Sequence, residues 1–245
     1  MHLSSGKAKA REVEILIVAA DREIVRPIVE ALSVLASIRV AVDSGGMRAV
    51  LRSRGIDLLI LDTSTPGLSA LSLCRIVRTT SMVPIIVLRD DRDPEGCIAA
   101  LEAGADDCVS RATGLREIEA RIRSLLRRAS FGAAALSPRT SLRFNGWSID
   151  PQSRLLHDPQ GAIVELTAAE FDLLWAFCRN RGKAIPREKL LALTHVGAAR
   201  PVDRSIDVHV SRLRRKIEID PHHPELLKTI RLGGYLFTPL VEADL

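Results

Sequence analysis

The first half of the chain alternates short apolar runs with longer amphipathic stretches. The apolar runs are typical of strands buried in a parallel sheet, and they cover Val13–Ala20, Ser37–Val42, Asp57–Asp62, Val83–Leu88 and Asp107–Ser110. The stretches between and after them have a helical period, and they cover Ile24–Leu35, a segment ending at Arg54, Ala70–Arg78, Gly96–Ala103 and Leu115–Arg128. Five strands, each followed by a helix, predict an α/β domain with a doubly wound, flavodoxin-like parallel sheet. Such a sheet has its functional site at the carboxyl ends of the strands.

The second half begins with short strands and continues with helices, which is an α+β pattern. Turn signals divide residues 142–166 into short strands. Thr167 and Glu170 form a capping box that opens a helix over Ala168–Arg179, and a second helix is predicted over Pro186–Leu193. The core candidates on the first of these helices are Leu174, Trp175 and Phe177.

Small residues and Pro138 separate the two patterns. The segment ASFGAAALSPRTS has too little apolar area to build a core, so it is predicted to be a flexible linker. The chain therefore divides into a first domain over residues 1–128, a linker over residues 129–141 and a second domain over residues 142–245.

The segment Asp203–Ile217 is predicted to form a helix with one apolar and one cationic face. The apolar stripe, at spacings of four, three and four, consists of Ile206, Val210, Leu213 and Ile217. The five residues from Arg212 to Lys216 carry four positive charges and no acid. Because arginines bind guanine edges or phosphates, this face suits a DNA major groove. A solvated amphipathic helix has the same pattern.

Two short strands after this helix decide between the two interpretations. Leu226–Ile230 and Tyr235–Phe237 flank a turn over residues 232–234, with Arg231 at its tip. A helix followed by a hairpin with a basic tip is the layout of a winged helix-turn-helix domain. The wing arginine suits the negative potential of a narrow minor groove.

The strings DRSIDVHVSRLRRKIE and TIRLGGYLF resemble the C-terminal effector domain of the OmpR/PhoB family of bacterial response regulators. The resemblance implies that the helix reads the major groove of double-stranded DNA and that Arg231 enters the minor groove. It also implies a loop over His195–Val202 that in this family touches RNA polymerase, although His195 stands where a tryptophan is common. The residues expected to contact DNA are Arg204, Val208, His209, Ser211, Arg212, Arg214, Arg215, Thr229 and Arg231.

The strings DLLILDTSTPG and EAGADDCVSR resemble the receiver domain of the same family, so the resemblance covers nearly the whole chain. It places Asp62 at the position of the phosphate acceptor. Nearly every partner of that acceptor departs from the family pattern. Alanines replace the acidic pair, arginines replace a hydroxyl residue and a lysine, and cysteine replaces the switch aromatic. These substituted positions are Ala19, Ala20, Arg89, Arg111 and Cys108.

The substituted pocket lacks most of the oxygen ligands that Mg²⁺ requires. Arg89 and Arg111 instead bring fixed positive charge towards Asp62. We interpret the pocket as one in which ion pairing has replaced phosphorylation. The alternatives are a structural acid in a degenerate pocket and a conventional regulator that phosphorylation activates.

The resemblance also predicts a homodimer that binds repeated half-sites. In this family receivers pair through the face made by the fourth helix, the fifth strand and the fifth helix. On that face Asp107 is expected to pair with Arg121, and Glu102 with Arg123.

Composition narrows the function further. A net charge of +5 and a pI near 9.3 fit a polyanion partner, while 3% aromatic residues argue against single-strand binding, which stacks bases on rings. No apolar run is long enough to span a membrane and no signal peptide is visible, so we expect a cytoplasmic protein with no membrane partner. No metal-ligand grouping, cofactor motif or catalytic constellation is visible, so we expect no metal, no cofactor and no enzymatic activity.

RNA polymerase and a sensor kinase are further candidate partners. The remaining alternative is a receiver that serves as an interaction module for a protein or a small ligand, with DNA binding secondary.

Overall fold

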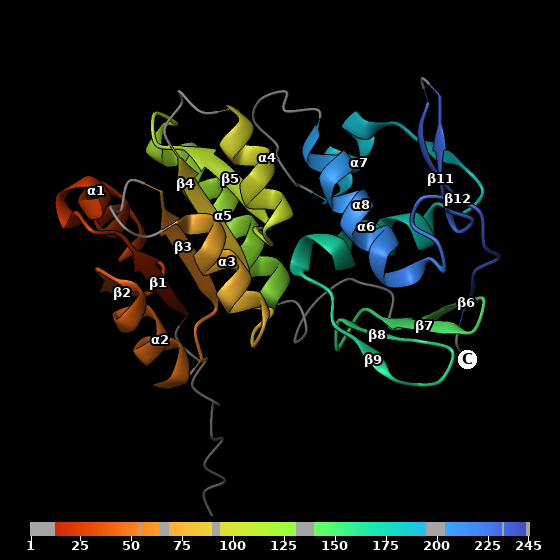
Figure 1. The fold of residues 1–245 in the computed structure, drawn as a ribbon, viewed down its shortest axis with the longest axis horizontal. Coiled ribbons are helices and arrows are strands. Elements are labelled where there is room, and N and C mark those ends of the chain that lie inside the picture. The colour runs from red at the N-terminus through yellow and green to blue at the C-terminus, as the bar shows by residue number, and fades with distance from the viewer. Residues whose placement is uncertain are drawn as a thin grey trace, which may run out of the picture.

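The computed structural model describes residues 13–53, 55–63, 69–89, 94–130, 140–194, 204–231 and 233–243. These residues form two domains that lie side by side, the first built on a parallel sheet and the second on antiparallel sheets and helices (Figure 1).

The first domain is a parallel sheet with the strand order β2-β1-β3-β4-β5. Its strands are β1 (Glu14–Val18), β2 (Ser37–Ala41), β3 (Leu58–Asp62), β4 (Ile85–Arg89) and β5 (Asp107–Ser110). Its helices are α1 (Arg22–Leu32), α2 (Ser44–Ser53), α3 (Ala70–Arg78), α4 (Pro94–Glu102) and α5 (Leu115–Ser130). The strand order reverses between β1 and β3, which is where a doubly wound sheet opens a crevice at the carboxyl ends of its strands. The predicted fold class is confirmed.

Apolar side chains cover both faces of this sheet. Ile28 of α1 and Ile122 of α5 pack on one face, and Met47 of α2 and Cys74 of α3 pack on the other. All five residues of β3 are buried. A strand covered on both sides has no polar face, and this explains its unbroken apolar run.

In its described residues, the second domain has two antiparallel sheets and three helices. The first sheet has the order β13-β6-β7-β8-β9. Its strands are β6 (Leu142–Phe144), β7 (Trp147–Asp150), β8 (Leu155–His157), β9 (Ile163–Val164) and β13 (Glu242–Ala243). The helices are α6 (Ala168–Arg179), α7 (Arg187–Thr194) and α8 (Arg204–Ile217). The second sheet has the order β10-β12-β11, with β10 (Ala184–Ile185), β11 (Leu227–Ile230) and β12 (Gly234–Phe237).

Aromatic rings form the centre of the second core. Phe237 packs edge to face on Phe144, with ring centroids 5.1 Å apart, and stacks near Phe177 at 6.4 Å. Leu174 and Phe177 are fully buried, as predicted, and Trp175 is partly buried against the same core. The helix that carries them has the predicted bounds, because its capping box fixes the start in local sequence.

Other helix ends differ from the predicted ones by a few residues. Helix α1 begins two residues before the predicted Ile24 because the exposed side chain of Asp21 caps it, accepting a hydrogen bond from the backbone N–H of Glu23. Strands β10 and β13 were not predicted. Each has only two residues, and their partners β12 and β6 lie far along the chain.

The two domains touch through helices. Helix α4 packs against α8, and α5 packs against α6 (Figure 1). Helix α5 ends at Ser130, two residues beyond the predicted Arg128, and residues 131–139 of the predicted linker lie outside the described residues. Among the described residues, no helix is both long and apolar enough to cross a membrane.

Candidate nucleic-acid interface and receiver pocket

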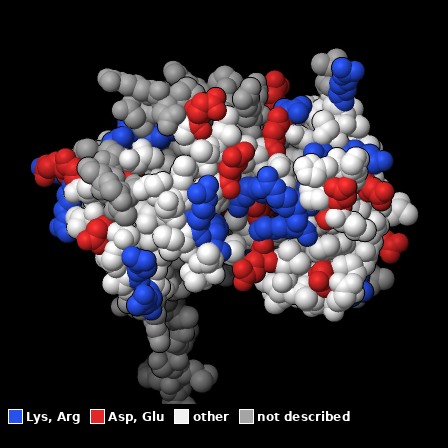
Figure 2. Space-filling model, viewed as in Figure 1, with Lys and Arg blue, Asp and Glu red and all other residues white. Residues whose placement is uncertain are grey.

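Helix α8 has the two faces that its sequence predicts. The residues of the apolar stripe are all buried in the core of the second domain, and they are Ile206, Val210, Leu213 and Ile217. On the opposite side Ser211 and Arg215 are exposed. Figure 2 shows a group of Lys and Arg side chains near the middle of the molecule, where Figure 1 places α8.

The hairpin after α8 forms the predicted wing. Strands β11 and β12 pair antiparallel, with Ile230 opposite Gly234, and the Arg231 side chain at the tip is exposed. Gly234 has a φ of +91°, and a Cβ atom at this position would lie 2.1 Å from the carbonyl oxygen of Ile185. The wing therefore requires glycine at this position for two reasons, the positive φ and the close packing against β10.

Polar contacts hold the wing to α7 and α8. Asp207 of α8 accepts hydrogen bonds from Arg187 Nε at 2.8 Å and from the Tyr235 hydroxyl at 2.5 Å. Burial and this carboxylate raise the pKa of Tyr235 to about 12, so the hydroxyl remains a donor. Arg214 donates to the carbonyl of Leu227 and to Thr229 Oγ1 at 2.8 Å. Two residues that we expected on DNA, Arg214 and Thr229, thus bind each other.

Glu170 is a buried carboxylate between two cations of α8. It lies 2.8 Å from Arg212 Nη2 and 2.7 Å from Lys216 Nζ, and it accepts the Thr167 backbone N–H of the capping box. Burial raises the pKa of Glu170, but the charges of Arg212 and Lys216 outweigh that effect and hold the pKa below its usual range. The carboxylate therefore stays ionised and fixes α8 to the start of α6.

The same arginine crosses the boundary between the domains. Arg212 Nη1 donates to the carbonyl of Leu101, at 3.0 Å, and to that of Ala105, at 3.3 Å. These carbonyls lie in the last turn of α4 and just beyond it. A cation there is favourable because the carboxyl end of a helix carries partial negative charge.

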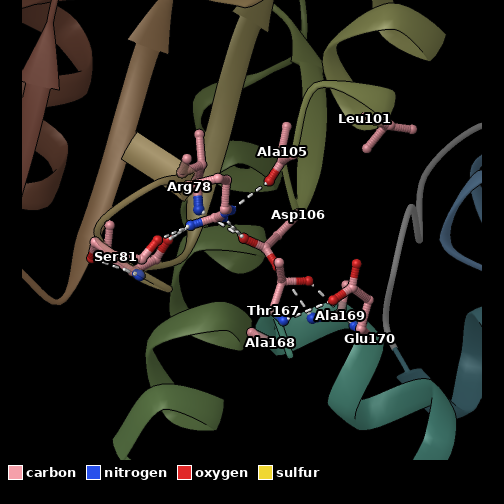
Figure 3. Close-up of polar contacts among 12 residues, drawn as sticks. Arg78, Ser81, Leu101, Ala105, Asp106, Thr167, Ala168, Ala169 and Glu170 are labelled. Atoms are coloured by element: carbon pink, nitrogen blue, oxygen red, sulfur yellow. Dashed lines mark hydrogen bonds and ion pairs between the residues drawn. The ribbon is translucent and has the colours of Figure 1, made fainter. Parts of the chain in front are cut away.

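An aspartate makes the reverse contact from the first domain. Asp106, almost fully buried, accepts the backbone N–H of Ala169 in the first turn of α6 at 3.2 Å (Figure 3). Its other oxygen lies 2.7 Å from Arg78 Nη2 and accepts the Ile85 backbone N–H. Asp106 belongs to the string EAGADDCVSR, but nothing in that string indicates a hydrogen bond to a residue 63 positions away.

His209 and Val208 are covered at this boundary. His209 is fully buried, and Val208, 9% exposed, belongs to the core cluster of the first domain. Burial, and after it the charge of Arg212, lower the pKa of His209 to about 4. The ring is therefore neutral at pH 7. The side chain of Arg204, which we expected on DNA, lies outside the described residues. The loop over residues 195–202, which we expected to touch RNA polymerase, lies outside them too.

The carboxyl ends of β1, β3 and β5 carry Ala19, Asp62 and Arg111 at one edge of the sheet. Asp62, 3% exposed, lies 3.4 Å from Arg111 Nη1. Ala19 is buried and Ala20 is exposed at the end of β1, and neither carries a side-chain oxygen. Asp21, the next residue, caps α1 instead, accepting the backbone N–H of Glu23.

Two thiols and an arginine lie beside this pocket. Contact with the Cys108 thiol lowers the pKa of Cys97, and the Arg89 guanidinium adds to that effect. The described structure holds no disulfide, and Cys74, Cys97, Cys108 and Cys178 are all free. Among the described residues, no group of three or more His, Cys, Asp or Glu side chains could hold a metal ion.

Comparison with known proteins agrees with this two-domain layout. Residues 15–123 match the family model described as response regulator receiver domain, and residues 161–237 match the one described as transcriptional regulatory protein, C terminal. The transcriptional regulatory protein AruR of Pseudomonas aeruginosa is 42% identical over 75% of this chain and 76% of its own length. The regulatory protein VirG of Agrobacterium fabrum is 38% identical over 94% of this chain and 91% of its own.

The chain belongs to the OmpR/PhoB family of response regulators. The aerobic respiration control protein ArcA of Escherichia coli, 35% identical over 80% of this chain and 84% of its own length, is a further relative. A mutant of RitR has the same fold, with a TM-score of 0.70 at 18% identity over 92% of this chain and 99% of its own. This OmpR/PhoB regulator is therefore a two-component response regulator that acts on transcription by binding DNA through its winged-helix domain. The family consists of regulators and not of enzymes, which agrees with our expectation.

On the face through which we predicted that two receivers pair, charged side chains form ion pairs within one chain. Asp107 lies 2.9 Å from Arg121 Nη1, and Glu117 lies 2.9 Å from Nη2 of the same arginine. Arg123 pairs with Glu119 within α5, and Glu102 is exposed. Asp107, Arg121 and Arg123 thus already have partners within one copy of this regulator. The dimer contact itself stays a prediction.

Arg231→Ala should weaken DNA binding by ~1–3 kcal/mol at duplexes with narrow, A·T-rich minor grooves and by less at G·C-rich ones, because a wing arginine reads groove width. Fluorescence anisotropy with both duplexes measures the difference. Lys228→Ala is the matched control, since Lys228 is an exposed cation on β11 of the same hairpin. We expect it to change affinity equally for the two duplexes. An Arg231→Ala variant that binds both duplexes as tightly as wild type would contradict the wing assignment.

Proposed function

We propose that this regulator controls transcription without aspartyl phosphorylation, by binding duplex DNA as a dimer on repeated half-sites. The observation that supports it is the pocket at the carboxyl ends of β1 and β3. Asp62 lies there beside Arg111, while Ala19 and Ala20 stand where the family has its acidic pair.

The chemistry of phosphoryl transfer makes this pocket unsuitable. A receiver requires Mg²⁺ to offset the charge that develops on the phosphoryl oxygens, and Mg²⁺ requires oxygen ligands in a near-octahedral arrangement. Ala19 and Ala20 provide no side-chain oxygen. The guanidinium of Arg111, 3.4 Å from Asp62, repels a cation at the place where the metal would bind and stabilises the carboxylate, which makes it a weaker nucleophile.

Wild-type protein treated with acetyl phosphate and Mg²⁺ should show no added phosphoryl group. Intact-mass spectrometry measures this directly, and calorimetric titration with Mg²⁺ should give no more heat than Asp62→Asn does. A positive control is a conventional receiver treated in the same tube. A stoichiometric mass gain of one phosphoryl group in wild type, absent from Asp62→Asn, would show that the pocket is functional and would reject this proposal.

The dimer follows from how winged helices bind DNA. One recognition helix contacts few base pairs, and two copies on neighbouring half-sites multiply the affinity when the spacing fits. The α4–β5–α5 face is the surface that we infer for pairing. A receiver that serves only as a module for a protein or small ligand is the second candidate, and none of the described contacts favours it over the first.

A further inference from the structure

The receiver covers part of the face of α8 that we expect to read DNA. Val208 packs in the core cluster of the receiver, His209 is fully buried, and the Arg212 side chain is only 11% exposed. Ser211 and Arg215, on the same helix, remain exposed. The recognition helix is thus divided between a covered part that contacts α4 and an open part that faces solvent.

We propose that this closed arrangement is a self-inhibited state, in which Asp106 of the receiver and Arg212 of the effector domain form a clasp that must open before α8 enters a major groove. The clasp consists of two reciprocal contacts. Asp106 accepts the N–H of Ala169 at the start of α6, and Arg212 donates to the carbonyls of Leu101 and Ala105 at the end of α4.

The two contacts complement each other electrostatically. A helix start carries unpaired N–H groups and attracts an anion, and a helix end carries unpaired carbonyls and attracts a cation. Each domain therefore supplies the charged side chain that the other domain's helix terminus lacks. Arg78 and Glu170 hold the two charged groups in place, at 2.7 Å from Asp106 and 2.8 Å from Arg212 (Figure 3 shows Arg78, Asp106 and Glu170).

Docking on α4 and docking on DNA exclude each other. An α-helix with its side chains is ~10–12 Å wide, and a B-DNA major groove is ~12 Å wide, so a helix in the groove leaves no room for a second helix on the same face. Arg212 can bind either the α4 carbonyls or a guanine edge, but not both. The intact clasp therefore lowers DNA affinity in proportion to the fraction of molecules that are open.

The closed state also contains a feature that favours opening. Among the described residues, neither ring nitrogen of His209 makes a hydrogen bond of good geometry, and the backbone of Asp106 is a polar group close to the ring. A buried polar group without a well-formed hydrogen bond is unfavourable, and water or DNA supplies better contacts once α8 is released. The clasp stabilises closure and His209 opposes it, which is the balance that a reversible switch requires.

Amide exchange in the wild-type chain tests the clasp without any substitution. The probe is a duplex recovered by selection from a random-sequence pool, and the readout is hydrogen exchange resolved by NMR at two neighbouring amides of α6. The N–H of Ala169 bonds to Asp106 of the receiver, whereas the N–H of Glu170 bonds to Thr167 within the effector domain. With saturating duplex, exchange at Ala169 should accelerate about tenfold or more while Glu170 stays protected.

An unchanged Ala169 rate at saturating duplex would overturn the proposal, because α8 would then bind DNA with the clasp intact. Faster exchange at both amides would overturn it too, because the whole helix start would have loosened.

A charge substitution gives a second, independent measurement. Asp106→Asn keeps the shape of the side chain but removes the charge, and it should raise the affinity for the selected duplex by about five- to tenfold. Asp57→Asn is the matched control, since Asp57 also accepts a backbone N–H, that of Glu14, but within the receiver. It should leave the affinity unchanged. Equal affinities of Asp106→Asn and wild type, with the receiver folded by circular dichroism, would reject the clasp.

Discussion

Gly234→Ala should destabilise the effector domain by about 3 kcal/mol or more and remove specific DNA binding. The backbone at Gly234 has a φ of +91°, a region that costs an L-residue roughly 1–2 kcal/mol. The added Cβ would also lie 2.1 Å from the carbonyl oxygen of Ile185 and 2.8 Å from Pro186 Cα. Both neighbours are backbone atoms that cannot rotate away, so β10 and β12 must separate, and overpacking of this kind costs roughly 1–3 kcal/mol more.

Urea unfolding followed by tryptophan fluorescence measures this loss in the full-length chain. Both tryptophans, Trp147 and Trp175, lie in the effector domain, so their fluorescence reports on that domain alone. Gly161→Ala is the matched control, because Gly161 has a φ of +83° and no atom within 4 Å of the added Cβ. It should cost only the backbone penalty of ~1–2 kcal/mol. Equal losses in the two variants would show that the Ile185 contact contributes nothing.

Glu170→Ala should destabilise the effector domain by about 3–5 kcal/mol, because it leaves two cations of α8 without their buried counter-ion. Glu170 joins Arg212, Lys216 and the N–H of Thr167. Glu170→Gln retains an oxygen for the Thr167 N–H but loses the charge, so it should be less destabilising than Glu170→Ala. The same fluorescence measurement ranks the three proteins. A glutamine variant as stable as wild type would mean that the ion pairs contribute little.

The charge of Glu170 also gives this effect a dependence on pH. The pKa of Glu170 in the folded domain lies below the ordinary value of about 4.3. Its contribution to stability is therefore fully present above the ordinary pKa and is lost as the pH falls through the lower, folded value. The gap between wild type and Glu170→Gln should be constant from pH 7 to about pH 5 and should shrink in stronger acid.

The clasp and the substituted receiver pocket form one consistent account. In the receiver pocket Asp62 lies beside Arg111, which makes it a poor phosphate acceptor in our proposal. Helix α8 has two mutually exclusive partners, α4 and DNA. Their competition can regulate the protein without phosphate. Helices α4 and α5 both contact the effector domain, so opening the clasp would also free the face that we infer for pairing. DNA binding and pairing would then favour each other, because both require the open state.

Local patterns in the sequence determined the secondary structure and the two folds. Periods of two and 3.6 residues depend on side chains that are near neighbours along the chain, so the parallel sheet, the apolar stripe of α8 and the capping box of α6 could all be predicted. The pocket residues Asp62 and Arg111 could also be brought together, because the carboxyl ends of all strands in a parallel sheet lie at one edge of that sheet.

The partners of charged surface residues were decided by the tertiary structure. The sequence placed Arg212 on the polar face of α8 but could not say that carbonyls 107 and 111 residues away would cover it. It likewise gave no partner for Asp106, and it missed the two-residue strands β10 and β13. A helix pattern specifies which face is polar, whereas the surface that meets that face depends on how two separately folded domains fit together. That fit arises from shape and charge across the whole boundary, and no periodic pattern in either domain encodes it.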